Sequence, residues 1–277
     1  FDHLTNRLRA EGEEHLDEVI EELELESFPV VDVWVLRKVA DYYRLHGVEN
    51  RAPEWAAGLS FRNQARIILV NGVGKGGEMI DVDATFKHEL AHVAMDVASA
   101  GKGVPRWFNE GYALMHAAEW TAERSNKLSQ AAAGGSITPF SNLTDYFPAH
   151  HNSASLAYAQ SYHFVRYLSQ RFGDDIYAGI LERIRKGKTF DEAFKAEAGE
   201  SLKLAEARWK QQLESSSSPW AIFSDEMVLF FGASLLFLVA WGVRRYRTRK
   251  KLAQMALEDA DTAWDYDESK YPLPGER

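Results

Sequence analysis

The stretch "FKHELAHVAMD", residues 86–96, constrains the fold more than any other part of this chain. Its apolar residues recur with helical spacing on most sides, so we expect a buried helix that starts near residues 83–85. His88 and His92 are four residues apart and therefore project from one face of that helix, one turn apart. Glu89 lies beside His88. Three polar side chains on a buried helix require a partner, and a metal ion would satisfy them.

A further ligand for such an ion occurs in "PRWFNEGYA", residues 105–113. Glu110 follows His92 at the start of a second predicted helix, which runs towards Trp120. A catalytic zinc ion has three protein ligands and one open position for water. This segment therefore offers Glu110 as a third zinc ligand beside His88 and His92. A His-Glu-x-x-His pattern alone arises by chance in roughly a few chains in a hundred, so Glu110 adds specificity.

Composition limits the kinds of site and partner. The chain has 277 residues, 45% of them hydrophobic, which is enough for one sizeable core. It has no cysteine, so disulfide bonds and thiolate metal sites are excluded, and any metal must be held by histidine and carboxylate ligands. The net charge of −9 gives a nucleic-acid partner no electrostatic support.

The hydrophobic periodicity changes along the chain. Residues 13–26 have helical periodicity, whereas residues 30–36 and 65–70 are rich in β-branched residues and predict strands. After residue 83 the pattern is helical, and residues 189–192 have the spacing of a capping box. These patterns predict a small N-terminal sheet followed by a mostly helical half that carries the candidate metal ligands.

The two motifs together resemble those of the gluzincin metallopeptidases, the clan of thermolysin and the aminopeptidase-N-like enzymes. In that clan an HExxH helix is followed by a second helix with a glutamate ligand, often within a Trp, small polar, Glu, Gly, aromatic, Ala string. This chain matches the string at Trp107, Asn109, Glu110, Gly111, Tyr112 and Ala113. The resemblance implies a zincin-like α+β fold, matching in layout over about residues 28–213, and we expect a metallopeptidase domain at residues 1–214.

The resemblance also implies zinc-assisted hydrolysis of peptide bonds in a peptide or protein substrate. Zinc would polarise the scissile carbonyl and activate a water molecule, and Glu89 would act as the general base. Tyr158, in "YAQSYHFVRYL", matches the tyrosine that stabilises the transition state in aminopeptidase-N-like enzymes. Tyr158 could equally be a core aromatic residue, and Tyr162 and His163 are substitutes for the catalytic role.

One part of the aminopeptidase pattern is missing. Those enzymes hold the free amine of the substrate with a Gly-x-Met-Glu-Asn strand, and this chain has only a superficial echo at residues 76–81, where Glu78 is a candidate. The departure favours an endopeptidase over an exopeptidase. The strand at residues 65–70 is expected to be the upper edge strand, which in this clan pairs with the substrate backbone. Three other histidines are expected to be surface or packing residues: His116, His150 and His151.

The C-terminal part predicts a membrane anchor. Residues 227–243 carry no formal charge, and the next eight residues, 244–251, hold six basic side chains. We therefore predict a linker at 215–226, a transmembrane helix at 227–243 and a cytoplasmic tail at 244–277. The positive-inside rule would place the catalytic domain outside the cytoplasm, after a signal peptide that has been removed. A buried core helix is the alternative for residues 227–243.

Two functions fit these observations. The first is a membrane-anchored zinc endopeptidase that works on nearby extracytoplasmic protein segments. The second is a peptidase-like zinc-binding domain that acts as an interaction or signalling module. The presence of Glu89 favours the first, because a structural zinc site has no use for a general base and normally closes its fourth position with another protein ligand.

Overall fold

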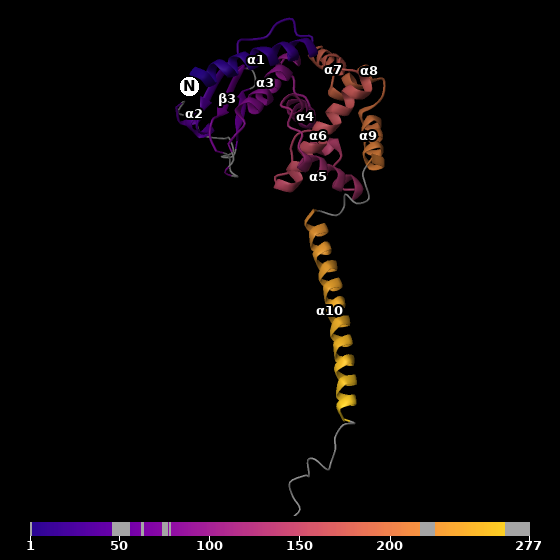
Figure 1. Cartoon of the computed structure of the whole chain (residues 1–277). Coiled ribbons are helices and arrows are strands. Elements are labelled where there is room, and N and C mark those ends of the chain that lie inside the picture. The colour runs from indigo at the N-terminus through magenta and orange to yellow at the C-terminus, as the bar shows by residue number, and fades with distance from the viewer. Residues whose placement is uncertain are drawn as a thin grey trace, which may run out of the picture. The chain divides into compact units, whose positions relative to one another are not determined.

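The computed structural model describes residues 2–45, 56–61, 64–73, 77, 79–216 and 225–263. It divides into two compact units, Phe1–Ile222 and Phe223–Arg277, which are considered separately. Figure 1 shows the elements of both units along the chain. Glu78, most of the predicted linker and residues 264–277 of the predicted tail lie outside the described residues.

The N-terminal third of the first unit contains a small sheet and two helices. Its elements are α1 (Asp2–Glu22), β1 (Asp32–Leu36), α2 (Val39–Leu45), β2 (Gly58–Phe61) and β3 (Arg66–Val70). The three described strands have the order β1-β3-β2, in which β1 is parallel to β3 and β2 is antiparallel to it. Helix α1 begins earlier than the predicted range of residues 13–26, and it ends at Glu22, before the end of that range.

Strand β3 lies in the middle of this sheet. The prediction that residues 65–70 form an edge strand is therefore wrong, although the strand itself is present. Ile67, Ile68 and Leu69 have no exposed surface, because a central strand that is covered on both faces buries consecutive side chains. The edge strand next to β3, on the side opposite β1, is β2. The hydrophobic pattern did not predict it.

The rest of the first unit is helical. Its elements are α3 (Val82–Ala98), α4 (Arg106–His116), α5 (Ala122–Ala133), a 3-10 turn (Phe140–Leu143), α6 (His151–Phe172), α7 (Ile176–Arg185), α8 (Phe190–Ala198) and α9 (Leu202–Ser216). The predicted capping box is confirmed, with Thr189 and Glu192 each satisfying a backbone group at the start of α8. A large core joins α4, α6, α7 and α9, with Trp107, Phe164 and Trp209 at its centre.

Helix α10 (Asp225–Ala263) contains the predicted transmembrane segment. Within the described part of the chain, however, no helix combines the length and the apolar character required to cross a bilayer. The uncharged stretch at 227–243 is shorter than the ~20 residues that a spanning helix usually has, and the helix continues directly into the basic residues 244–251. The predicted transmembrane helix is wrong, as are the α+β fold class that included it and the single-pass membrane localisation. The chain is mostly helical with a small three-stranded sheet.

Candidate metal centre

Helix α3 carries the first three residues of the site. It starts after Asp81, whose side chain accepts hydrogen bonds from the backbone N–H groups of residues 83 and 84 at 3.1 and 3.0 Å. Its apolar faces pack against α1 and the sheet on one side and against α4 on the other. The helix is therefore packed on both sides where it carries His88, Glu89 and His92. Glu89 is only 8% exposed.

Helix α4 brings Glu110 to the same place. Trp107 anchors its first turn, fully buried among aromatic rings of the core. Gly111 allows α4 to lie directly against α6, since a Cβ atom there would be 2.4 Å from the carbonyl oxygen of Ser161. No other residue type fits at this crossing without movement of a helix. Glu110 is therefore held one residue from this close contact between α4 and α6.

The three predicted ligands converge on one point. Nε2 of His88 and Nε2 of His92 are 3.2 Å apart, and Oε2 of Glu110 lies 3.8 Å and 3.9 Å from them, respectively. Tetrahedral zinc with ligand distances of about 2.0–2.1 Å places its donor atoms ~3.3 Å apart. Among the residues that the structure describes, this is the one group of three or more such side chains close enough to hold a metal ion. The donor set and its spacing fit a zinc ion.

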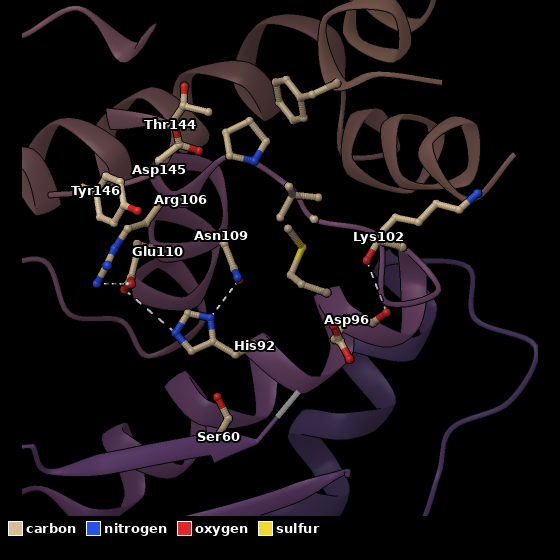
Figure 2. Close-up of a pocket in the computed structure, with 16 residues that line it drawn as sticks. Ser60, His92, Asp96, Lys102, Arg106, Asn109, Glu110, Thr144, Asp145 and Tyr146 are labelled. Atoms are coloured by element: carbon tan, nitrogen blue, oxygen red, sulfur yellow. Dashed lines mark hydrogen bonds and ion pairs between the residues drawn. The ribbon is translucent and has the colours of Figure 1, made fainter. Parts of the chain in front are cut away.

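Hydrogen bonding on the far side of His92 supports this interpretation. Nδ1 of His92 lies 2.8 Å from Oδ1 of Asn109, a contact drawn in Figure 2. An amide oxygen only accepts, so Nδ1 donates this hydrogen bond. Nε2 of His92 is then left with a lone pair that points towards the other two donors. A lone pair directed at a second imidazole nitrogen and a carboxylate oxygen is unfavourable without a cation or a proton between them. Asn109 thus orients His92 as metal-binding histidines are usually oriented.

Glu119 faces the other ligand histidine. Nδ1 of His88 is buried without a hydrogen-bond partner, and Oε1 of Glu119 lies 3.9 Å from it. Arg124 holds this carboxylate through an ion pair of 3.1 Å. The pKa of His88 is well below its usual value, first because of burial and then because of the nearby His92 and Arg124. A neutral imidazole is the form that binds a metal. Sequence reasoning missed Glu119, which lies beyond the end of α4.

Strand β2 contacts the candidate base. A Cβ atom on Gly58 would be 2.8 Å from Oε1 of Glu89, so the glycine allows the strand to lie against the carboxyl group. Burial raises the pKa of Glu89, and the nearby His92 and hydrogen bonding from the side chain and backbone of Ser60 partly oppose the rise. Glu89 is thus held beside the ligands without being one of them.

Tyr158 lies near enough to Glu110 and Arg106 to interact with both. Burial and the charge of Glu110 raise the pKa of Tyr158, whereas Arg106 opposes the rise through its charge and a hydrogen bond. Arg106 also forms an ion pair of 3.3 Å with Glu110 and stacks over the ring of Phe147. Sequence reasoning missed Arg106, although its i, i+4 spacing to Glu110 is a recognisable signal.

The two substitutes for Tyr158 are occupied elsewhere. Tyr162 stacks on Trp120 with the ring centroids 4.7 Å apart. His163 accepts a hydrogen bond of 2.9 Å from Nε1 of Trp209. Of the three residues considered for this role, Tyr158 is therefore the one that interacts with Glu110.

Three other histidines, His116, His150 and His151, lie away from the cluster. Nε2 of His116 is 2.7 Å from a carboxylate oxygen of Glu22 on α1, and its ring packs against Tyr112. His150 and His151 are exposed at the start of α6. Their expected roles as packing and surface residues agree with these positions.

Two of the predicted ligands, His92 and Glu110, line a cavity of about 750 Å³. His92, Asn109 and Glu110 line its floor in Figure 2, and Ser60, Arg106 and Tyr146 lie around them. The side chain of Tyr146 is 79% exposed at this site. A molecule in the cavity would therefore reach two of the ligands and the edge strand together.

Comparison with known proteins agrees with this geometry. A family model of the Peptidase MA superfamily matches residues 44–215, more than half of the chain, and this range contains all three predicted ligands. The uncharacterised protein YhcO of Bacillus subtilis (strain 168) is 26% identical over 139 residues, which cover 47% of this chain and 41% of YhcO. The chain thus spans less than half the length of this relative. No solved structure shows a significant match. This chain belongs to the Peptidase MA superfamily.

Proposed function

We propose that this chain is a zinc-dependent peptidase that hydrolyses peptide bonds, with His88, His92 and Glu110 as the zinc ligands. The observation that supports this most directly is the position of Glu89, which is held next to the three converging donors but is not among them. Membership of the Peptidase MA superfamily agrees with this activity.

Zinc is favoured by the chemistry of the donors. Two imidazoles and one carboxylate form the three-ligand set found in catalytic zinc sites, which leaves a position for water. A zinc ion in this site would lower the pKa of its water towards neutrality and polarise the scissile carbonyl. Asn109 and Glu119 would support the ligand histidines, because outer hydrogen-bond partners fix ring orientation and basicity.

Glu89 would act as the general base. Its raised pKa brings the carboxyl group closer to neutral pH, where a base is most effective in taking a proton and returning it to the leaving amine. Gly58 leaves room for its carboxyl group beside β2. Glu89 would therefore accept the proton of the attacking water and transfer it within the cleft.

Tyr158 would stabilise the developing oxyanion. A tyrosine phenol is protonated at neutral pH, and the raised pKa of Tyr158 keeps it so, which leaves the hydroxyl able to donate a hydrogen bond. Arg106 would hold the hydroxyl in place from one side. This role matches that of the tyrosine in the aminopeptidase-N-like enzymes, which the stretch at 158–168 resembles.

The edge strand supports an extended peptide as the substrate. The backbone N–H of Val70 donates to the carbonyl of Ala57, so the alternate residues Gly58 and Ser60 direct their backbone groups away from β3. An extended chain could pair along this edge beside the metal ligands. The absence of the Gly-x-Met-Glu-Asn string favours cleavage within chains over removal of N-terminal residues.

The test compares the full-length chain with Glu89→Gln, using Glu123→Gln as a control because Glu123 is an exposed glutamate on α5. We expect all three proteins to bind one zinc ion per chain by elemental analysis. Wild type and the control should cleave a peptide library, and Glu89→Gln should lose at least ~100-fold in rate, the scale of a general base. Near-normal turnover by Glu89→Gln would remove Glu89 from the mechanism. Zinc binding without cleavage by the wild type would favour the interaction module.

A further inference from the structure

A second groove lies next to the metal-site cavity and has no role in the mechanism above. Its volume is about 450 Å³. It is bordered by Pro29 and Val30 before β1, by Gln64 and Ala65 before β3, and by the C-terminal half of α3. Its apolar lining residues are Pro29, Val30, Phe61, Ala65, Val93, Val97 and Ala100.

The groove and the metal-site cavity are continuous. Ser60, His92 and Asp96 line both of them. His92 is a predicted metal ligand, and Ser60 interacts with Glu89, the candidate base. A molecule that occupies the groove would therefore extend directly into the site where hydrolysis is proposed.

The lining of the groove suits an apolar side chain. Val93 is buried in the core beneath it, Val97 is half-buried, and Val30 is 95% exposed at its rim. A Leu or Phe side chain placed there would remove apolar surface of its own and of Val30 and Val97 from water. The metal-site cavity differs, because the charged residues Lys102, Arg106 and Glu110 line it and do not line the groove.

The direction of β2 brings a peptide to the groove. The strand runs from Gly58, beside Glu89, to Phe61, which lines the groove. An extended peptide paired with this edge advances ~3.3 Å per residue and directs alternate side chains to the same face. A side chain within about three residues of the scissile bond would therefore reach the groove.

We propose that this groove is a substrate subsite that binds one large apolar side chain of the peptide, at a fixed distance from the bond that is cut. The proposal rests on the proposed function. It names the substrate as an extended, unfolded segment with Leu, Phe or a similar residue at that position. It also identifies Val30 and Val97 as residues that determine specificity.

The experiment maps cleavage sites in a peptide library digested by the zinc-loaded, full-length chain. Two variants change the groove, Val30→Asp and Val97→Asp. Val73→Asp is the matched control, because Val73 is also an exposed valine, at 62% exposure, but does not line the groove. Zinc content and melting temperature check the fold of each variant, and Val30→Asp carries the test if Val97→Asp is unstable.

We expect the wild type to prefer Leu or Phe over Ala about tenfold at one position, the scale of discrimination by an apolar pocket. Both groove variants should reduce this preference to about twofold or less and should gain a preference for Lys or Arg at the same position. Val73→Asp should retain the wild-type profile. The proposal is overturned if Val30→Asp keeps the wild-type profile, or if Val73→Asp changes it equally. Absence of any cleavage by the zinc-loaded wild type would instead refute the proposed function, and the subsite with it.

Discussion

Gly111→Ala tests whether the crossing of α4 and α6 sets the position of Glu110. An added Cβ atom would lie 2.4 Å from the carbonyl oxygen of Ser161, 2.7 Å from its carbonyl carbon and 2.6 Å from Cγ2 of Val165. Two of these three atoms belong to the backbone of α6 and cannot rotate away. The helices themselves must therefore move apart.

The size of the movement follows from these distances. Ordinary van der Waals contact begins at about 3.4 Å, so α4 must shift by ~1 Å relative to α6. Overpacking of this kind costs about 1–3 kcal/mol of unfolding free energy. Metal–ligand distances are tolerated only within about 0.2 Å, so a shift of Glu110 by ~1 Å would disturb coordination. We expect the zinc affinity to fall at least ~10-fold, and the metal-free protein to be less stable as well.

The assay measures zinc affinity by competition with a chromophoric chelator, and stability by urea unfolding of the metal-free protein. Gly72→Ala is the control, because a Cβ atom there meets its nearest neighbour, a backbone oxygen, at an ordinary distance of 3.5 Å. The reasoning is refuted if Gly111→Ala binds zinc as tightly as Gly72→Ala and loses less than about 0.5 kcal/mol.

Three further changes test the site and its surroundings. Glu110→Ala removes one of the three donors, so dialysed protein should lose its zinc and the rise in melting temperature that zinc produces, whereas full zinc content would place the third ligand elsewhere. Glu119→Gln keeps the size of the side chain but removes the charge near His88, and chelator competition should show zinc binding about 10–100-fold weaker; unchanged affinity would make Glu119 a surface residue. Burial lowers the pKa of His15 from 6.5, and the nearby His116 is the second cause. The contribution of neutral His15 to stability is therefore complete above about pH 6.5. It is lost below that pH, where the unfolded chain takes up a proton. His15→Gln should therefore lose less unfolding free energy than the wild type between pH 7 and pH 5, and equal losses would contradict this assignment.

The helix with His88 and His92 was predictable because its signal is local. Apolar residues with helical spacing define one helix, and four-residue spacing puts both histidines on one face of it. Glu110 is not local to this helix, and its assignment depended on the resemblance of its motif to a known family. Thr189 was also predictable, since a capping box is a pattern within four residues.

Strand β2 was not predictable in the same way. It has only four residues, and two of them, Gly58 and Ser60, are poor strand formers. Its presence depends on pairing with β3 and on the space that Gly58 leaves beside Glu89. Because β2 is not recognisable in the sequence, residues 65–70 were wrongly assigned to the edge of the sheet. A buried apolar run has the same pattern in any covered strand. The membrane prediction failed for a related reason, as an uncharged stretch of marginal length does not specify its surroundings.

In the stretch from Trp107 to Tyr112, four of the residues that match the family string each make a different contact. Trp107 fixes the first turn of α4 in the aromatic core, and Asn109 orients His92. Gly111 sets the approach to α6, and Tyr112 donates a hydrogen bond of 2.7 Å to Glu22 on α1. Helix α4 is thus held by α1 on one side and by α6 on another, while α3 packs against it with the two histidines. Because three contacts determine the position of the helix, Glu110 has little freedom to move relative to the two histidines. A site prepared in this way loses little entropy on binding zinc, and that cost would otherwise weaken the affinity.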